Sequence, residues 1–182
     1  ELSSGVTTIF STYLAFAALK EDGSVVTWGD DRFDGSYGGD SSSVASKLSS
    51  GVSTIFSNGR AFAALKDDGS VVTWGRSSGG GDSSGVASEL SSGVTTIFSN
   101  VQGQAFAALK EDGSVVTWGS SSGGGDSSGV ASELSSGVTT IFSNVQGQAF
   151  AALKEDGSVV TWGSSSGGGD SSGVASELSS GV

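Results

Sequence analysis

The 182-residue chain is acidic, with 8 Lys and Arg against 19 Asp and Glu and a formal net charge of −11. This charge disfavours binding to DNA or RNA, and the basic residues are too scattered to form a patch for phosphates or for an anionic membrane surface. The chain has no Cys and no His, which excludes disulfides, zinc sites, cysteine nucleophiles and serine–histidine triads of the usual kind.

A tandem repeat organises the whole chain. Residues 89–132 and 133–176 are the same 44-residue string, and the four tryptophans recur at intervals of 46, 44 and 44 residues. A period of this length is typical of stacked or radially arranged units. We therefore divide the chain into four repeats and the start of a fifth: residues 1–46, 47–88, 89–132, 133–176 and 177–182. Because it stops as a fifth copy begins, we expect the chain to be part of a longer protein.

The block DSSGVASELSSG, which joins the second repeat to the third at residues 82–93, has two interpretations. Val86 and Leu90 are spaced i to i+4, as on one face of a helical turn. Asp82 could cap the first free N–H groups of that turn, and Gly93 could end it in a left-handed conformation. Gly85 argues against a helix because it costs about 1 kcal/mol relative to Ala. A fourth, outer strand is the alternative, and the sequence does not choose between them.

Three strands are predicted in each repeat. Residues 94–99 are rich in β-branched side chains, which favour strands. Residues 105–110 and 114–118 then flank Asp112 and Gly113, and this arrangement predicts a hairpin. Gly113 can adopt positive φ either in a two-residue turn or as the bulge glycine of a three-residue loop.

The first strand of the hairpin is apolar on both faces. Phe106 and Ala108 point one way, whereas Ala105, Ala107 and Leu109 point the other way. A three-stranded sheet of this size cannot cover such a strand alone, so we expect neighbouring repeats to pack on both faces. We also expect the tryptophan that ends each hairpin to be a buried core residue rather than a platform for a sugar.

Length differences between the repeats predict the positions of the loops. They fall in two places only: between Phe10 and Phe16, when compared with Phe98 to Phe106, and between Trp28 and Asp40, when compared with Trp74 to Asp82. Loops tolerate such changes better than hydrogen-bonded strands do. The glycine-rich string GSSSGGGDSSG reads as a turn-rich connector, because no Lys follows it at the spacing of a phosphate-binding loop.

The hairpin block AFAALKEDGSVVTWG resembles the repeat of the regulator of chromosome condensation family. The matching residues, with their equivalents in the other repeats, are Ala108, Leu109, Asp112, Gly113, Val115, Trp118 and Gly119. The resemblance implies a β-propeller with one repeat per blade. The array is also similar to repeats in very large secreted or surface proteins of marine bacteria. The predicted fold is thus an all-β tandem repeat with propeller-like blades of three to four antiparallel strands, and the alternative is an open β-solenoid or filament-forming array.

Four aspartates are candidate calcium ligands, because each follows two or three glycines: Asp40, Asp82, Asp126 and Asp170. Calcium takes 6 to 8 oxygen ligands, which one carboxylate cannot supply, so a capping or turn role is the favoured interpretation. The adjacent Glu111 and Asp112 lie at an exposed hairpin tip, where no burial would separate their pKa values into an acid and a base. We identify no catalytic or cofactor-binding residue.

The leading hypothesis is a non-enzymatic structural repeat segment of a secreted or cell-surface bacterial protein, which gives reach, rigidity or attachment and can assemble into a filament. Its partners would be copies of itself, neighbouring repeats of a longer chain or other surface proteins, with no nucleic acid and no membrane insertion. The alternative is a closed propeller that binds proteins. Its recognition residues would be the side chains unique to the first two repeats: Tyr13, Arg32, Phe33, Tyr37, Arg60 and Arg76.

Overall fold

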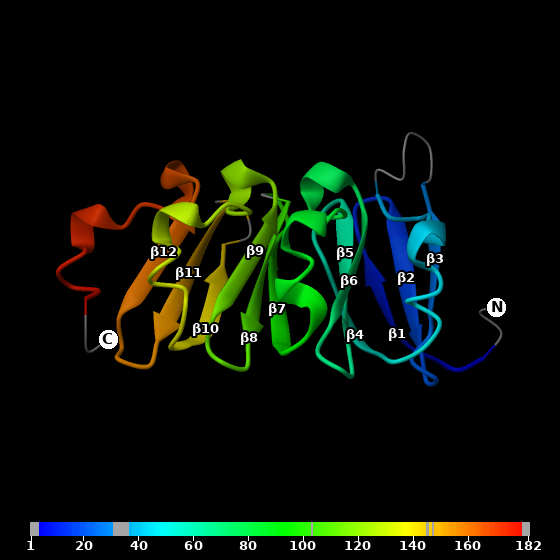
Figure 1. Ribbon diagram of the computed structural model, residues 1–182. Coiled ribbons are helices and arrows are strands. Elements are labelled where there is room, and N and C mark those ends of the chain that lie inside the picture. Colours follow the sequence, from blue (N-terminus) through cyan, green and yellow to red (C-terminus); the bar gives the residue numbers. More distant parts are fainter. Residues whose placement is uncertain (1–3, 31–36, 103, 145, 147, 180–182) are drawn as a thin grey trace.

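The computed structural model describes residues 4–30, 37–102, 104–144, 146 and 148–179, which form four separate three-stranded antiparallel sheets (Figure 1). In every sheet the strands follow chain order, so each repeat contributes one sheet. The strands are β1 (Val6–Ser11), β2 (Ala15–Lys20) and β3 (Val25–Gly29); β4 (Val52–Ser57), β5 (Ala61–Lys66) and β6 (Val71–Gly75); β7 (Val94–Asn100), β8 (Ala105–Lys110) and β9 (Val115–Gly119); and β10 (Val138–Ser143), β11 (Ala149–Lys154) and β12 (Val159–Gly163).

The hairpin between the second and third strands is confirmed, with the three-residue loop. Leu109 pairs with Val115, and the Lys110 N–H donates to the Ser114 carbonyl at 2.9 Å. Gly113 has a φ of +74°, the left-handed conformation that such a loop requires of its last residue. The strand expected at residues 94–99 is also confirmed, as β7.

The linkers between sheets form short 3-10 turns instead of a fourth strand. Within residues 82–93 these turns are Ser84–Val86 and Glu89–Ser91, and Gly93 is left-handed with a φ of +73°. The helical interpretation is therefore confirmed in 3-10 form, and the fourth strand is wrong for the described residues. The other turns are Ser42–Val44, Ser77–Gly79, Ser121–Gly123, Ser128–Val130, Ser165–Gly167 and Ser172–Val174. No helix in the described part of the chain is long and apolar enough to cross a membrane.

A linker nevertheless lies where a fourth strand would be. The Val115 N–H at the start of β9 donates to the Leu134 carbonyl at 2.9 Å, and the Thr117 hydroxyl donates to the Gly125 carbonyl at 3.2 Å. The Thr117 hydroxyl also bonds to the Ser127 hydroxyl at 2.9 Å. Isolated bonds of this kind replace a continuous ladder because the linker is built from Ser and Gly, which favour turns over extended strands.

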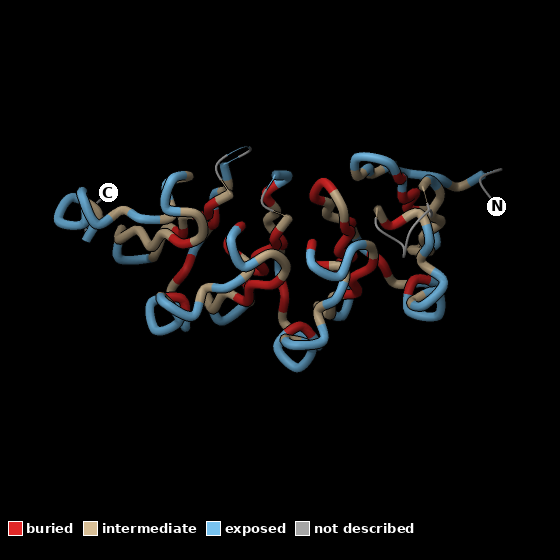
Figure 2. The backbone as a smooth tube through the Cα atoms, turned by 90° about the horizontal axis from the view of Figure 1, so that it is seen from above, coloured by how far each residue is buried: buried red, intermediate tan, exposed pale blue. Residues whose placement is uncertain are grey.

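The four sheets stand face to face in a curved row, with the first and the last at opposite ends (Figures 1 and 2). Buried residues lie between the sheets, and exposed residues lie in the linkers and hairpin tips (Figure 2). The described residues therefore form an open array rather than a closed ring.

Each core cluster belongs to a pair of neighbouring sheets. Ala61, Ala63 and Leu65 of the second sheet pack against Phe106 and Ala108 of the third. Equivalent clusters join the first sheet to the second and the third to the fourth. The expectation that the central strand is covered on both faces is confirmed for the two inner sheets.

Candidate functional site

The joint between neighbouring sheets is the feature that recurs most closely along the chain, and an aromatic pair lies at its centre. Phe106 and Trp118 pair across β8 and β9, with their ring centroids 5.2 Å apart and their planes at 19°. Both side chains are buried, which confirms the core role of this tryptophan. The equivalent pairs have centroid distances of 5.1 to 5.3 Å: Phe16–Trp28, Phe62–Trp74 and Phe150–Trp162.

The aromatic pair packs on a glycine of the preceding repeat. The Trp118 indole Nε1 donates to the Gly80 carbonyl at 3.1 Å. Gly80 has a φ of +96°, and a Cβ atom built on it would lie 2.6 Å from Cδ2 of Phe106. Only glycine fits here, because a side chain would be strained at this φ and would clash with the Phe106 ring. Gly38 and Gly124 receive Trp74 and Trp162 in the same way.

Further hydrogen bonds hold the strand ends at each joint. The Ser99 hydroxyl donates to the Ser57 carbonyl at 2.8 Å, and the Ser143 hydroxyl donates to the Ser99 carbonyl at the same distance. At the hairpin tips, the Val94 N–H donates to the Gly69 carbonyl of the preceding repeat at 3.0 Å. The joint therefore combines an apolar centre with main-chain acceptors along its edges.

A buried asparagine, which was not predicted from the sequence, orders the loop beside the joint. Asn100 is 1 % exposed, and its side chain donates to the Gly123 carbonyl at 2.6 Å and accepts from the Ala105 N–H at 3.2 Å. The first repeat has Thr12 instead, whose hydroxyl donates to the Tyr37 carbonyl at 2.8 Å. The signal in the sequence was an asparagine at one repeat position in three of the four copies.

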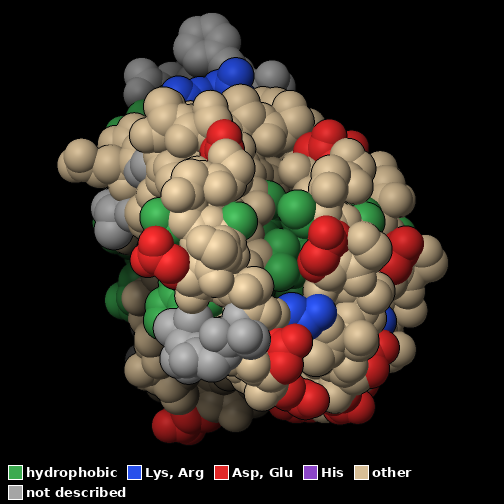
Figure 3. All heavy atoms as spheres, turned by 90° about the vertical axis from the view of Figure 1, so that its left-hand side faces the viewer, with side chains coloured by type: hydrophobic (Ala, Val, Ile, Leu, Met, Phe, Trp, Pro, Cys, Tyr) green, Lys and Arg blue, Asp and Glu red, His purple; other side chains and the backbone are tan. Residues whose placement is uncertain are grey.

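Among the described residues, no further sheet covers the outer faces of the first and fourth sheets. Ile9 is 56 % exposed and Phe16 is 44 % exposed, although their equivalents Ile97 and Phe106 are buried at 2 % and 0 %. On the fourth sheet Phe142 is 60 % exposed. Figure 3 looks onto this end of the row and shows hydrophobic side chains at its centre, with acidic side chains around them.

The four candidate calcium ligands lie one per linker, where each carboxylate accepts a backbone hydrogen bond. The Ser84 N–H donates to Oδ1 of Asp82 at 2.9 Å, which lowers the pKa of this carboxyl. The same bond and the same direction of the pKa are found at Asp40, Asp126 and Asp170. The described residues contain no group of three or more acidic side chains placed to hold a metal ion. Calcium binding stays a prediction.

The acidic hairpin tips serve the turn. Oδ1 of Asp112 accepts from the Ser114 hydroxyl at 2.6 Å and from the Ser114 N–H at 3.0 Å. These bonds lower the pKa of the exposed Asp112 carboxyl, the hydroxyl being the larger cause. An ionised, solvated carboxylate of this kind does not suit proton transfer near neutral pH.

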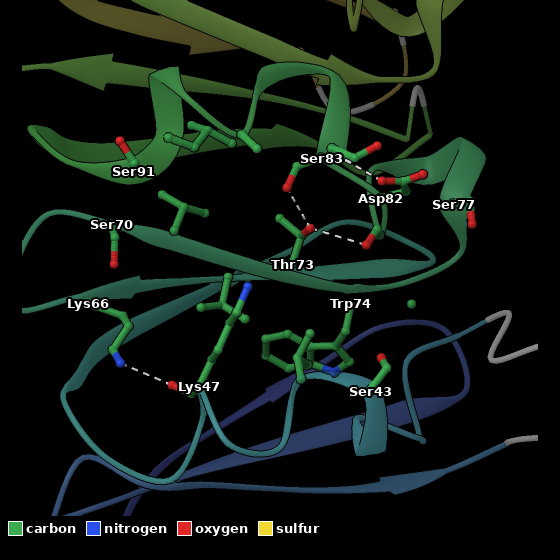
Figure 4. Close-up of a pocket in the computed structure, with 18 of the residues that line it drawn as sticks. Ser43, Lys47, Lys66, Ser70, Thr73, Trp74, Ser77, Asp82, Ser83 and Ser91 are labelled. Atoms are coloured by element: carbon green, nitrogen blue, oxygen red, sulfur yellow. Dashed lines mark hydrogen bonds between the residues drawn. The ribbon is translucent and has the colours of Figure 1, made fainter.

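A groove of about 980 Å³ runs over β6, between the linkers that follow the first and second sheets (Figure 4). In its wall the Thr73 hydroxyl bonds to the Gly81 carbonyl at 3.1 Å and to the Ser83 hydroxyl at 2.9 Å. At its other end the Lys66 ammonium donates to the Lys47 carbonyl at 3.1 Å. A smaller groove of about 360 Å³ lies over β12 in the equivalent place. The groove thus follows from the repeated linker and is not a unique site.

The side chains unique to the first two repeats gather near one joint. The Arg60 guanidinium lies 5.6 Å from the centroid of the Tyr37 ring, close enough for a cation–π contact. The Tyr13 ring covers Gly59, where a Cβ atom would lie 2.4 Å from it. Arg76 is joined to Arg60 only through the main chain, whose N–H donates to the Arg60 carbonyl at 3.0 Å, and its side-chain Nε donates to the Ser78 hydroxyl at 2.9 Å. Arg32 and Phe33 lie outside the described residues.

No family model matches this sequence, and no curated protein is similar to it in sequence. The fold is similar to that of solved β-propellers. Yeast RCC1 (Prp20), solved bound to Kap60, has a TM-score of 0.53 at 18 % identity, with 87 % of this chain and 42 % of that chain covered. Prp20p from Saccharomyces cerevisiae, described with its binding to Gsp1p and histones, gives 0.51 at 17 % identity, over 87 % and 43 %.

Human WBSCR16 is similar to the same extent, with a TM-score of 0.52 at 16 % identity over 87 % of this chain and 47 % of that chain. The chain therefore spans less than half the length of each of these propellers. At such identities the likeness concerns the fold. The four sheets are RCC1-like propeller blades, which confirms the resemblance seen in the hairpin block.

Proposed function

We propose that the chain is a non-enzymatic structural repeat segment of a secreted or cell-surface bacterial protein, and that it gives this protein reach, rigidity or attachment. The observation that carries the proposal is the joint between sheets, which occurs three times with the same aromatic pair, the same tryptophan–glycine hydrogen bond and the same serine–serine hydrogen bond. Arrays in which each repeat contacts only its neighbours gain length and stability with every added copy.

The linkers support a structural role as well. The third and fourth repeats are identical in their linkers as much as in their strands. A binding site for one partner needs side chains that differ from blade to blade, whereas a spacer does not. The chain also has no Cys or His, and the Asp112 carboxylate at the hairpin tip accepts hydrogen bonds within the turn.

Rigidity can be measured because the chain has no cysteine of its own. Ala87 and Ala175 are exposed at equivalent positions in the second and fourth repeats. Spin labels on the variant Ala87→Cys/Ala175→Cys should give one narrow distance distribution by pulsed electron paramagnetic resonance. The pair Ala131→Cys/Ala175→Cys, one repeat apart, is the matched control. A distribution that broadens strongly from one repeat to two would contradict a rigid array.

The extracellular location and the assembly into filaments are parts of the same proposal. Acidity, the absence of Cys and the Ser- and Gly-rich linkers support the location, and the open outer faces of the first and fourth sheets support assembly. Antibody labelling of intact bacterial cells should detect the protein; labelling only after permeabilisation would refute the location. Electron microscopy of the concentrated protein should show particles of several chains.

A protein-binding blade array is the second candidate function. Tyr13, Tyr37, Arg60 and Arg76 favour it, because tyrosine and arginine are enriched among the residues that dominate binding energy. The similar yeast protein binds other proteins. Chemical cross-linking on the cell surface, followed by mass spectrometry, tests this candidate. A protein captured by the natural chain and lost with Tyr37→Ala/Arg60→Ala supports it; equal capture by both chains contradicts it.

A further inference from the structure

We propose that a second copy of this chain docks head-to-tail, so that the first sheet of one copy packs on the fourth sheet of the other through the contacts that join the sheets within the chain. This inference rests on the proposed function, because it names the partner and the contact by which the array continues. Four observations carry it.

The first sheet presents half of a joint. Phe16 and Trp28 stack with their centroids 5.3 Å apart and their planes at 20°, the geometry of the three inner pairs. Phe16 and Ile9 are nevertheless exposed, whereas the equivalent residues of the other three sheets are buried. The aromatic pair is thus ordered in its docking geometry before anything covers it, which reduces the entropy lost on binding.

The fourth sheet presents the other half. Gly168 has a φ of +94°, close to the +96° of Gly124, so its backbone has the conformation of an occupied joint. A Cβ atom on Gly124 would lie 2.7 Å from Cδ2 of Phe150, whereas a Cβ atom on Gly168 would meet nothing within 4 Å. Gly168 therefore has the backbone conformation of a glycine that packs under an aromatic ring, with space beside it for such a ring.

The polar groups of the two faces are complementary. In every inner joint a tryptophan N–H of the following repeat meets a glycine carbonyl, and a serine hydroxyl meets a serine carbonyl. Trp28 and Ser11 supply these donors on the first sheet. Gly168 and Ser143 supply the acceptors on the fourth. Docking would satisfy both, because the hydrogen bonds match those of the inner joints.

The occupant is a second copy because the strand sequences of the two open faces are those of the inner joints. The strings AFAALK and VVTWG are the same in all four repeats, so the first sheet fits any face that follows this pattern. The two faces differ from one another, which makes the contact heterologous: a first sheet pairs with a fourth sheet and not with another first sheet.

The test uses single charges on exposed side chains of the two faces. Ile9→Asp and Phe142→Asp each place a carboxylate at the centre of one face, and Val101→Asp makes a comparable change in a loop of the third repeat, where Val101 is also exposed. In sedimentation velocity from micromolar to millimolar concentration, the natural chain and Val101→Asp should form larger species. Ile9→Asp and Phe142→Asp should stay monomeric, with unchanged circular dichroism.

Mixing the two monomeric variants tests the direction of docking. Ile9→Asp keeps its fourth-sheet face and Phe142→Asp keeps its first-sheet face, so the mixture should form one heterodimer and nothing larger. The inference is overturned if the natural chain remains monomeric, if either variant alone assembles like the natural chain, or if the mixture forms no heterodimer. None of these outcomes affects the spin-label distances within a monomer, which test the proposed function separately.

Discussion

The indole Nε1 of Trp118 donates a hydrogen bond of 3.1 Å to the carbonyl oxygen of Gly80, a residue 38 positions earlier in the chain. The same glycine lies under the ring of Phe106, where it has room only because it lacks a Cβ atom. The bond therefore fixes the aromatic pair of one sheet to the main chain of the preceding repeat. Since a main-chain acceptor cannot change rotamer, this contact sets the position of each sheet relative to its neighbour.

Adding a methyl group to the glycine under the aromatic pair should destabilise the fold, and the chain contains its own control. Gly124→Ala places a methyl group against Phe150, whereas Gly168→Ala places it in open space at nearly the same φ. The positive φ costs about 1 kcal/mol in both variants, and overpacking adds about 1–3 kcal/mol to the first. Urea unfolding of the dilute monomer should therefore show a loss for Gly124→Ala that is at least twice as large. Equal losses in the free energy of unfolding would mean that the space between Gly124 and Phe150 tolerates the methyl group.

Replacing the loop asparagine with Ala should also lower the stability of the protein more inside the array than at its end. Asn100 and Asn144 both donate to a glycine carbonyl, of Gly123 and of Gly167 respectively, but Asn100 is buried and Asn144 is exposed. Asn100→Ala leaves main-chain groups unsatisfied away from water, at a cost of about 1–3 kcal/mol. At Asn144 water replaces the amide, so the loss should be smaller. Thermal unfolding of the two variants gives the comparison, and a larger loss for Asn144→Ala would refute this account.

The strands could be predicted from the sequence because their signals are local. The hairpin at Asp112 and Gly113 is specified by a turn glycine between two apolar runs, and the two apolar faces of the strand at Phe106 predict cover on both sides. The secondary structure of the linker at residues 82–93 could not be predicted. Its spacing of Val86 and Leu90 suits one turn of helix, but whether the outer edge of β9 accepts a strand or isolated bonds depends on tertiary contacts.

Only one of the two partners in each joint, the tryptophan, could be predicted from the sequence. A repeated Trp118 predicts a buried residue, but its acceptor Gly80 lies in another repeat, inside a string that reads as a connector. Its positive φ and its contact with Phe106 arise only when the sheets are stacked. Asn100 was missed for a similar reason, since an asparagine in a polar loop resembles any other until its amide is found buried.

Acid should weaken the hairpin tips through the aspartates that accept from serine. Hydrogen bonds from Ser24, Ser70, Ser114 and Ser158 lower the folded-state pKa of the four tip aspartates. A lowered folded-state pKa stabilises the fold above the unfolded pKa of about 4 and loses this effect as the pH falls through the folded value. Protonation also relieves repulsion within a chain of net charge −11, so the two effects of acid on stability oppose each other.

Amide variants separate these two effects of acid. Changing the four tip aspartates to Asn keeps a pH-independent acceptor for the serines, so the urea midpoint should fall less between pH 6 and pH 3 than in the natural chain. The changed residues are Asp22, Asp68, Asp112 and Asp156. The control changes the four preceding acids to amides, which removes the same charge but not the acceptors: Glu21, Asp67, Glu111 and Glu155. Identical acid sensitivity of the two variants would contradict the role of the serine bonds.

Calcium should leave the stability of the protein unchanged. Asp40, Asp82, Asp126 and Asp170 each accept a hydrogen bond within their own linker, and a single carboxylate is far from the 6–8 oxygens that the ion requires. Thermal unfolding with 5 mM calcium chloride, on the order of the weakest protein sites, and with magnesium chloride as the control for ionic strength, should give the same Tm. A rise specific to calcium would instead support the calcium hypothesis.

Deleting one whole repeat should test whether the joints couple the sheets. Because residues 89–132 and 133–176 are identical, removal of residues 89–132 joins Ser88 to Glu133 and leaves every remaining junction with its natural sequence. The shorter chain loses one joint and keeps both outer faces. In a coupled array the free energy of unfolding and the urea midpoint both fall, and the m-value falls by roughly a quarter because less surface is exposed on unfolding. If the sheets unfolded independently, the midpoint would not move, since each repeat would keep its own stability.

Inserting a further copy of the same 44 residues reverses the change in a coupled array, so the midpoint should rise with repeat number in a series of three, four and five repeats.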